Sequence, residues 1–579
     1  MILAGRGQLA MSSSPALLSV TWVAPAAVAR REGLRLALIA GFYLSGLALM
    51  FWSEVAIVPK VVFVLTFGLV NCFWLALLRR PLVSAALALL LSCLVIWLSK
   101  LKYDIIWMTA NFLDVWIVNT DTVRFLLAVR PDLSAKIVIA AAFIVPAMAL
   151  LWWIDPLRVR LRTAAAGFVL CLAGVTGTAL AFPQEGWEAF FGDSYVSKFS
   201  RSGVSAVSEL LLRGYMESAE VVADRLKILP TATCTPSDKP PHIILVHDES
   251  SFDIRVAPGI KVPAGYGAQF RSFDGKARHF IAEGAGGPSW YTEYNVLAGL
   301  SARSFGRFAY YVTHIAAGRV ERGLPAALRR CGYRTFSIYP AFGAFMSARS
   351  FQTTTGVQKF IDQPALGTDR IEPDQFYFNT ALKMIEREQG KGPMFLFVYL
   401  AQNHYPWNFR WRPDLLPEWR DLGNPGEVDE YLRRQALSAQ DYGKLLDELK
   451  RKFPSEAFLL VRYGDHQPDF ASTLLEPSLD EAGVNRRLMS YDPRYFTTYY
   501  AIDAVNFKPV DLSSALDTLE GPYLPLVVQE AAGLPLDASF SEQKKILRRC
   551  NGLFYACAGG AEARRFNRLL IDAGLIKGL

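Results

Sequence analysis

The chain has 579 residues, which is too long for a single hydrophobic core, so we expect at least two structural units. Hydrophobic residues make up 52% of the sequence and the mean hydropathy is +0.21, which excludes an ordinary soluble enzyme of this length. The net charge of +8 is modest, and the clustered arginines follow membrane topology, so the composition does not favour a nucleic-acid partner.

Five apolar stretches in the first third of the chain are each close to the length of a membrane-spanning helix. About 20 helical residues cross the hydrocarbon core of a bilayer, although a buried helix of a soluble protein would explain any one such stretch. Five in close succession, separated by short charged joints, favour a transmembrane domain over residues 35–182. The expected spans are residues 35–52, 55–78, 82–99, 135–154 and 164–182.

The arginines at the ends of these stretches predict the orientation. If the spans alternate in direction, the three arginine-bearing joints share one side, which the positive-inside rule makes cytoplasmic. Residues 1–34 are then cytoplasmic, and the chain beyond residue 183 lies on the periplasmic or outer side of the plasma membrane. Lys100 and Lys102 are exceptions. The arginines are Arg30, Arg31, Arg35, Arg79, Arg80, Arg158, Arg160 and Arg162.

Residues 103–130 mix aromatic and aliphatic residues with acidic ones and form no clean span. This pattern is typical of a helix lying along a membrane interface, and an ordinary amphipathic packing helix is the alternative. Residues 183–239 are expected to form a linker with a helix around 203–226 and a proline-rich break at 230–240.

The seven cysteines are too few for a disulfide scaffold. Cys550 and Cys557 are close enough in sequence for a bridge, which would need an oxidising compartment. Cys234 and Cys331 form a second pair or are free, and the three cysteines of the apolar stretches behave as small hydrophobic residues.

Residues 240–520 alternate strand-like and helical patterns, which predicts an α/β domain with a mostly parallel central sheet and helices on both faces. The expected strands are Ile243–Val246, Thr335–Tyr339, Met394–Tyr399 and Phe458–Arg462, and the expected helices are Trp290–Leu300, Gly323–Cys331, Asp374–Gln389 and Glu427–Lys452. Residues 521–579 are expected to form a basic helical extension, either a solvated packing face or a contact for anionic lipid.

Polar side chains follow three of the predicted strands. Glu249 comes after the first strand, Asn403 and His404 follow the third, and Asp465 and His466 follow the fourth. Open α/β sheets place ligands at the carboxyl ends of their strands, so we expect these side chains to meet there. Carboxylates and imidazole suit Zn²⁺ or Mn²⁺, so Glu249, Asp465 and His466 are candidate ligands of one divalent ion.

Ser289 is the candidate nucleophile. Glycines at 284, 286 and 287 permit a tight turn before it, and a helix beginning near Trp290 would direct its amide dipoles towards a phosphate. A nearby cation would lower the pKa of the hydroxyl, so Ser289 could attack without a dedicated base. A surface turn with Ser289 as helix cap is the plainer alternative, and Thr292 is a second candidate hydroxyl.

Taken in order, these motifs resemble a known family. The set Leu-Val-His-Asp-Glu249-Ser-Ser-Phe, Gly-Gly-Pro-Ser289-x-x-x-Glu293-Tyr, Asn403-His404-Tyr-Pro406 and Gly464-Asp465-His466 resembles the lipoteichoic acid synthase and phosphoglycerol transferase branch of the sulfatase/alkaline-phosphatase superfamily. The resemblance implies a sulfatase-like catalytic domain after five spans. It also implies that Glu249, Ser289, Asp465 and His466 hold the metal and that His404 contacts the transferred group or the leaving oxygen.

The chain departs from this family at two places. The family nucleophile is usually threonine, where this chain has Ser289. The histidine and tryptophan that grip phosphoglycerol in the synthases have no counterpart, and Arg349 is the candidate for the remaining arginine, since a guanidinium can hold phosphate bidentately.

The resemblance implies a membrane-bound, metal-dependent transferase that moves phosphoglycerol from a membrane phospholipid to an extracytoplasmic glycan or lipid through a phospho-serine intermediate. Phosphoethanolamine transfer to lipid A or a glycan is the nearest alternative. A membrane-tethered sulfatase or phosphodiesterase would use water instead, and a catalytically silent scaffold or sensor would use the fold alone.

Overall fold

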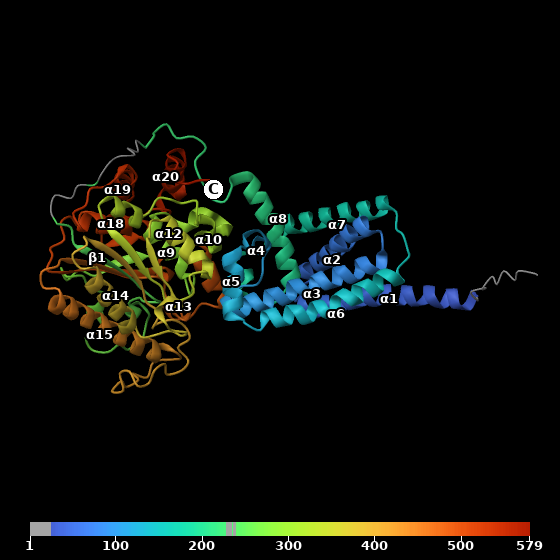
Figure 1. The fold of residues 1–579 in the computed structure, drawn as a ribbon, viewed down its shortest axis with the longest axis horizontal. Coiled ribbons are helices and arrows are strands. Elements are labelled where there is room, and N and C mark those ends of the chain that lie inside the picture. The colour runs from blue at the N-terminus through green and yellow to red at the C-terminus, as the bar shows by residue number, and fades with distance from the viewer. Residues whose placement is uncertain (1–24, 227–233, 235–238) are drawn as a thin grey trace, which may run out of the picture. The chain divides into compact units, whose positions relative to one another are not determined.

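The computed structural model describes residues 25–226, 234 and 239–579 and divides into two compact units. The first unit contains residues up to 110 together with 138–183 and 191–201. The second contains residues 111–137, 184–190 and 202–579. Figure 1 shows the helices of the first unit in blue and cyan and the sheet of the second in green to orange.

Five long apolar helices in the described residues confirm the five predicted spans. They are α1 (Pro25–Ser53), α2 (Ile57–Leu78), α3 (Pro81–Ile106), α6 (Leu133–Ile154) and α7 (Leu161–Ala181). Helices α2 and α7 approach closely at small residues: a Cβ atom on Gly167 would lie 2.8 Å from Cys72 Sγ, and one on Gly68 would lie 2.9 Å from Cys171 Sγ. Close backbone approach at glycine is the usual packing of helices within membranes.

The segment after α3 forms two short helices instead of one interfacial helix over 103–130. Residues 103–106 complete α3, after which come α4 (Phe112–Ile117) and α5 (Thr120–Val129). The side chains of Asn111 and Asn119 accept hydrogen bonds from backbone amides at the start of each helix, so each asparagine opens a new helix. The predicted helix at 203–226 is also wrong in its bounds. Helix α8 covers Tyr195–Arg213 and ends before Gly214, whose φ of +74° is left-handed.

The second unit is built on one eight-stranded sheet with the order β4-β3-β5-β1-β6-β7-β2-β8. Among these strands only β7 runs antiparallel to its neighbours. Leu245 of β1 is paired with Phe397 of β5 and Val461 of β6, so three apolar strands form the buried centre. The strands are β1 (His242–Asp248), β2 (Arg278–Ile281), β3 (Arg334–Ile338), β4 (Lys359–Ile361), β5 (Met394–Tyr399), β6 (Phe458–Gly464), β7 (Thr497–Val505) and β8 (Thr518–Glu520).

Helices cover both faces of this sheet, which confirms the predicted α/β layering. On one face, α14 (Asp374–Glu388) and α15 (Val428–Lys452) pack their apolar sides against Ile244 and Val246 of β1. Figure 1 shows α9 (Ser289–Ala298), α12 (Ala348–Thr354) and α18 (Leu524–Ala531) on the other face. The remaining α-helices of this unit are α10 (Val312–Ala316), α11 (Leu324–Arg330), α13 (Gln363–Leu366), α16 (Ala471–Leu475), α17 (Glu481–Met489), α19 (Ala538–Cys550) and α20 (Ala561–Asp572).

The basic residues of α19 and α20 are largely paired with carboxylates of the same unit. Arg565 lies 2.9 Å from Glu542, Arg549 lies 2.9 Å from Glu562, and Lys544 bonds Glu530. The packing-face interpretation therefore explains these charges without a lipid. Two disulfides, Cys234–Cys331 and Cys550–Cys557, also lie in this unit.

Candidate active site

The centre of the candidate site is the carboxyl edge formed by β1 and β6. Glu249 follows β1 and is 3% exposed, while Asp465 and His466 follow β6 and are 0% and 2% exposed. The two strands are neighbours in the sheet, so residues more than 200 positions apart meet where their strands end. A Cβ on Gly464 would lie 1.7 Å from the Ser251 carbonyl oxygen, so only glycine fits at this position.

Asp465 is held in place by backbone amides. Its Oδ1 accepts hydrogen bonds from Ser250 N at 2.7 Å and from His466 N at 2.8 Å. Its Oδ2 lies 3.2 Å from His247 Nε2 and 3.3 Å from His466 Nε2. One oxygen therefore fixes the carboxylate, and the other faces two imidazoles.

Ser289 is the first residue of α9 and points its hydroxyl at the same group. Its Oγ lies 3.2 Å from His466 Nε2 and 3.4 Å from Glu249 Oε2. Pro288, not Ser289, occupies the N-cap, and Gly286 has a left-handed φ of +68° in the preceding turn. The geometry fits a nucleophile at the amino end of a helix, where backbone N–H groups favour an anion.

The second candidate hydroxyl, Thr292, is fully buried and donates to the Asp465 carbonyl oxygen at 2.6 Å. This hydrogen bond ties α9 to the end of β6. Thr292 thus positions the helix that carries Ser289.

The donor set fits a divalent cation. One ligand atom each from His247, Glu249 and Asp465 lies within 4.8 Å of the others, and all three residues are buried. His466 Nδ1 lies 2.8 Å from the Gln467 carbonyl oxygen, which can only accept, so Nδ1 carries a proton, and Nε2, which faces Glu249 and Asp465, is the atom that would coordinate a cation. Two carboxylates that converge in a buried place call for a positive charge.

The pKa values of His466 and Asp465 are both shifted by the opposite charges of their neighbours. Burial lowers the pKa of His466, but the charges of Asp465 and Glu249 outweigh it and hold that pKa above its ordinary value. Burial likewise raises the pKa of Asp465, yet His466 and His247 hold it below its ordinary value. The site stabilises positive charge, as a metal centre must.

His247 belongs to this group although sequence reasoning read it only as part of an apolar strand. It is 0% exposed, its Nδ1 lies 2.7 Å from Tyr463 Oη, and its ring stacks on Tyr399 with centroids 3.8 Å apart. The signal was its spacing: His247 stands two residues before Glu249, and alternate residues of a strand face the same side. Asp248, between them, accepts a hydrogen bond from Tyr499 Oη instead.

His404 and Arg349 contact residues outside this group. His404 is exposed, and its Nδ1 lies 2.8 Å from the Tyr405 carbonyl oxygen, so Nε2 is the nitrogen that can exchange a proton. Asn403, one residue earlier, links this loop to the site through Nδ2, which lies 3.5 Å from the Ser250 carbonyl oxygen. Arg349 is half-exposed and pairs with Asp362 at 2.6 Å, so a phosphate would have to share or displace that carboxylate.

Glu293, four residues after Ser289 on α9, is a buried carboxyl with few partners. It is 0% exposed, and its Oε1 accepts from Gln352 Nε2 at 3.0 Å. Its Oε2 has no hydrogen-bond partner among the described residues. Burial raises the pKa of Glu293 to about 8, so the folded protein keeps this carboxyl protonated at pH 7.

We expect Glu293→Gln to stabilise the protein, most strongly at neutral and mildly alkaline pH. A raised folded-state pKa means that the folded state binds more protons than the unfolded state, so Glu293 lowers stability as pH rises from 4.5 to about 8. At pH 7 the variant should gain up to about 3 kcal/mol in the free energy of unfolding, and the gain should vanish near pH 4.5. Thermal unfolding in detergent across this pH range measures it, with the exposed Glu386→Gln as control. Equal pH slopes for wild type and Glu293→Gln would contradict the prediction.

Comparison with known proteins gives a family match and several distant structural likenesses. Residues 287–507 match the Sulfatase family model. The capsular polysaccharide biosynthesis protein RkpI of Rhizobium meliloti (strain 1021) is 28% identical over 278 residues, which cover 45% of this chain and 48% of that protein. The match thus spans about half the length of this curated relative.

Two solved structures illustrate the structural likenesses. The phosphoglycerol transferase GacH of Streptococcus pyogenes, in complex with sn-glycerol-1-phosphate, is 14% identical with a TM-score of 0.46, covering 60% of this chain and 89% of its own. The integral membrane phosphoethanolamine transferase EptA of Neisseria meningitidis is 12% identical with a TM-score of 0.42, covering 82% of this chain and 95% of its own. At these identities and TM-scores the likenesses assign no substrate.

Proposed function

We propose that the protein is a membrane-bound phosphoglycerol transferase of the sulfatase/alkaline-phosphatase superfamily, and the match of residues 287–507 to the Sulfatase family model supports this proposal. It would take the head group from a membrane phospholipid and pass it to an extracytoplasmic glycan. The observation that carries the proposal is the position of Ser289 Oγ, within 3.4 Å of both Glu249 and His466, in a chain with five candidate spans.

In the first half-reaction, the Ser289 hydroxyl loses its proton as Oγ attacks phosphorus and forms an O–P bond. The bond from phosphorus to the glyceride oxygen breaks, and that oxygen takes a proton as diacylglycerol leaves. In the second half-reaction, the acceptor hydroxyl loses its proton and attacks phosphorus, the bond from Ser289 Oγ to phosphorus breaks, and Oγ takes up a proton. His404 Nε2 is the nitrogen proposed to give and take these protons.

The residues proposed to hold the divalent ion are Glu249, Asp465, His466, Ser289 and the added candidate His247. Their mixed oxygen and nitrogen donors suit Zn²⁺ or Mn²⁺. When bound, such an ion supplies charge that favours the serine alkoxide and the phosphate oxygens. The helix amides of α9 add to this at the same place.

The proposal also places the catalytic unit outside the cytoplasm. The arginine-bearing joints between the spans support this orientation, and so do the two disulfides, since disulfides persist in oxidising compartments.

The test is head-group release by purified full-length protein in membranes of defined composition. Right-side-out vesicles containing acyl-labelled phosphatidylglycerol should yield labelled diacylglycerol, and vesicles containing phosphatidylethanolamine should yield much less. Release from phosphatidylethanolamine alone would show that the head group is phosphoethanolamine and not phosphoglycerol. Release only in inverted vesicles would show that the catalytic unit faces the cytoplasm. No release from any lipid would contradict a lipid-dependent transferase.

A further inference from the structure

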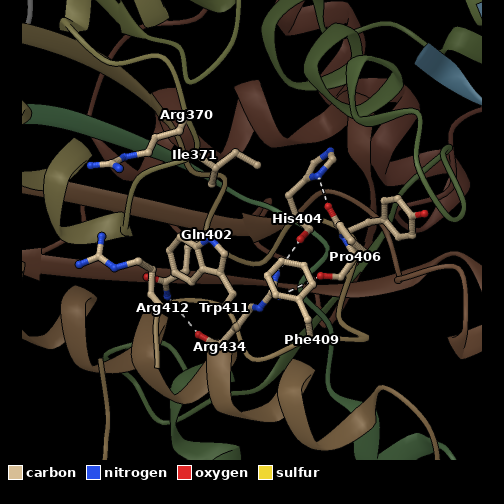
Figure 2. A pocket seen from close by; sticks show the side chains of 10 residues that line it. Arg370, Ile371, Gln402, His404, Pro406, Phe409, Trp411, Arg412 and Arg434 are labelled. Atoms are coloured by element: carbon tan, nitrogen blue, oxygen red, sulfur yellow. Dashed lines mark hydrogen bonds between the residues drawn. The ribbon is translucent and has the colours of Figure 1, made fainter. Parts of the chain in front are cut away.

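A cavity of about 250 Å³ lies beside the loop that follows β5. Its walls come from that loop, from α15 and from the segment before α14. Figure 2 shows two of its lining residues, Phe409 and Trp411, in the middle of the view, with Arg370 and Arg412 to one side and His404 to the other. His404, the residue proposed to exchange protons, therefore lines one side of this cavity.

Arg434 of α15 fixes the shape of this pocket. It is 2% exposed, and its guanidinium donates to the carbonyl oxygens of His404 at 2.9 Å and Pro406 at 2.8 Å. Its Nε donates to Glu430 at 2.8 Å. The bonds from Arg434 to the loop are among the dashed lines of Figure 2. Because this buried cation donates hydrogen bonds to carbonyl oxygens of the loop, it holds the loop in one conformation.

The pocket walls combine flat apolar rings with cationic donors. Phe409 is 50% exposed although it is aromatic, and Trp411 is half-buried. The two arginines at the side keep their charges beside carboxylates, Arg370 with Glu372 at 3.1 Å and Arg412 with Asp414 at 2.8 Å. No carboxylate lines the cavity among the described residues, so a metal ion is not the ligand expected here.

This chemistry matches a sugar ring. The C–H face of a pyranose packs on an aromatic face, and guanidinium N–H groups donate to ring hydroxyls. An acyl chain would make no hydrogen bonds to the arginines, and a lone phosphate would not pack against the two aromatic rings. The cavity volume is of the size of one ring with its hydroxyls.

The pocket and the candidate metal centre share one loop. Asn403 links to Ser250, the residue after Glu249, and Asn403 Oδ1 accepts from Trp407 Nε1 at 3.2 Å. From this continuity we infer that the cavity binds one pyranose unit of the acceptor glycan, adjoining the hydroxyl that receives the head group. The inference rests on the proposed function and assigns that function's acceptor subsite.

The test separates the two half-reactions. Phe409→Ala and Trp411→Ala should raise the acceptor KM about tenfold, equivalent to a loss of about 1.4 kcal/mol in binding. Diacylglycerol release in the absence of acceptor should stay at the wild-type rate. Phe273→Ala removes an equally exposed phenylalanine of the same unit that does not line the cavity, and it should change neither quantity. The acceptor probes are a neutral glucose hexasaccharide and a galacturonate hexasaccharide.

Calorimetric binding of the same two oligosaccharides provides a readout that does not depend on turnover. Binding of either one to wild type, weakened in Phe409→Ala and Trp411→Ala but not in Phe273→Ala, would support the subsite even if no lipid is cleaved. The inference is overturned if neither oligosaccharide binds wild type, or if the two variants bind as wild type does. It is also overturned if they slow diacylglycerol release, because the cavity would then hold the lipid head group.

Discussion

Replacing Ser289 with alanine is expected to reduce diacylglycerol release by about 10³-fold or more, because the variant has no oxygen to form the bond to phosphorus. The Oγ atom makes the hydrogen bonds of this side chain to Glu249 and His466, and alanine keeps its Cβ, so we expect the surrounding packing to stay in place. Mass spectrometry of wild type quenched during turnover should show a glycerophosphate adduct on the peptide that contains Ser289. The measurements are initial rates and intact-peptide mass.

Ser289→Thr is the matched control for this prediction. Threonine keeps the hydroxyl at the amino end of α9 and adds a methyl group at a position that is 7% exposed. We expect measurable release from this variant and an adduct on the threonine. Wild-type rates in Ser289→Ala would remove Ser289 from the mechanism and leave water as the attacking group.

The parts of the site that could be predicted are those where an apolar strand ends abruptly in polar residues. Glu249, Asp465 and His466 each follow such a strand, and parallel pairing brings the ends of β1 and β6 together. The long amphipathic helices α14 and α15 were predicted within one residue at each end because their apolar faces repeat at helical spacing. In these elements the local pattern and the tertiary packing agree.

The elements that escaped prediction depend on neighbours distant in sequence. Strand β7 carries Thr497, Thr498 and Asp503 within its nine residues, and its pairing with β2 and β6 decides its structure. Strands β4 and β8 have three residues each, too few for a periodic signal. His247 was missed because burial inside β1 hides its role until Asp465 arrives from β6. Helix α8 ends at Arg213, before Gly214, whereas the hydrophobic pattern continues beyond it.

Removing one side-chain oxygen from the proposed metal centre, in Asp465→Asn, is expected to abolish metal binding and to lower turnover by at least about 10²-fold. Asparagine keeps an oxygen for the backbone amides of Ser250 and His466 and replaces Oδ2 by an amide nitrogen that cannot act as a ligand. Elemental analysis of purified protein should give about one Zn or Mn per wild-type chain and nearly none in the variant. Added Zn²⁺ or Mn²⁺ should raise the Tm of chelated wild type and leave the variant unchanged, since only a protein that binds the ion gains stability from it.

Asp253→Asn provides the control, because Asp253 lies on the same loop after β1 and pairs with Arg255 outside the cluster. It should keep its ion and its metal-dependent rise in Tm. Were Asp465→Asn to bind the ion as tightly as wild type, the ligand set would have to be assigned elsewhere. Loss of the ion from both variants would instead point to a general effect on the loop after β1. The two variants are expected to differ in metal binding because Asp465 faces both imidazoles, whereas Asp253 faces an exposed guanidinium.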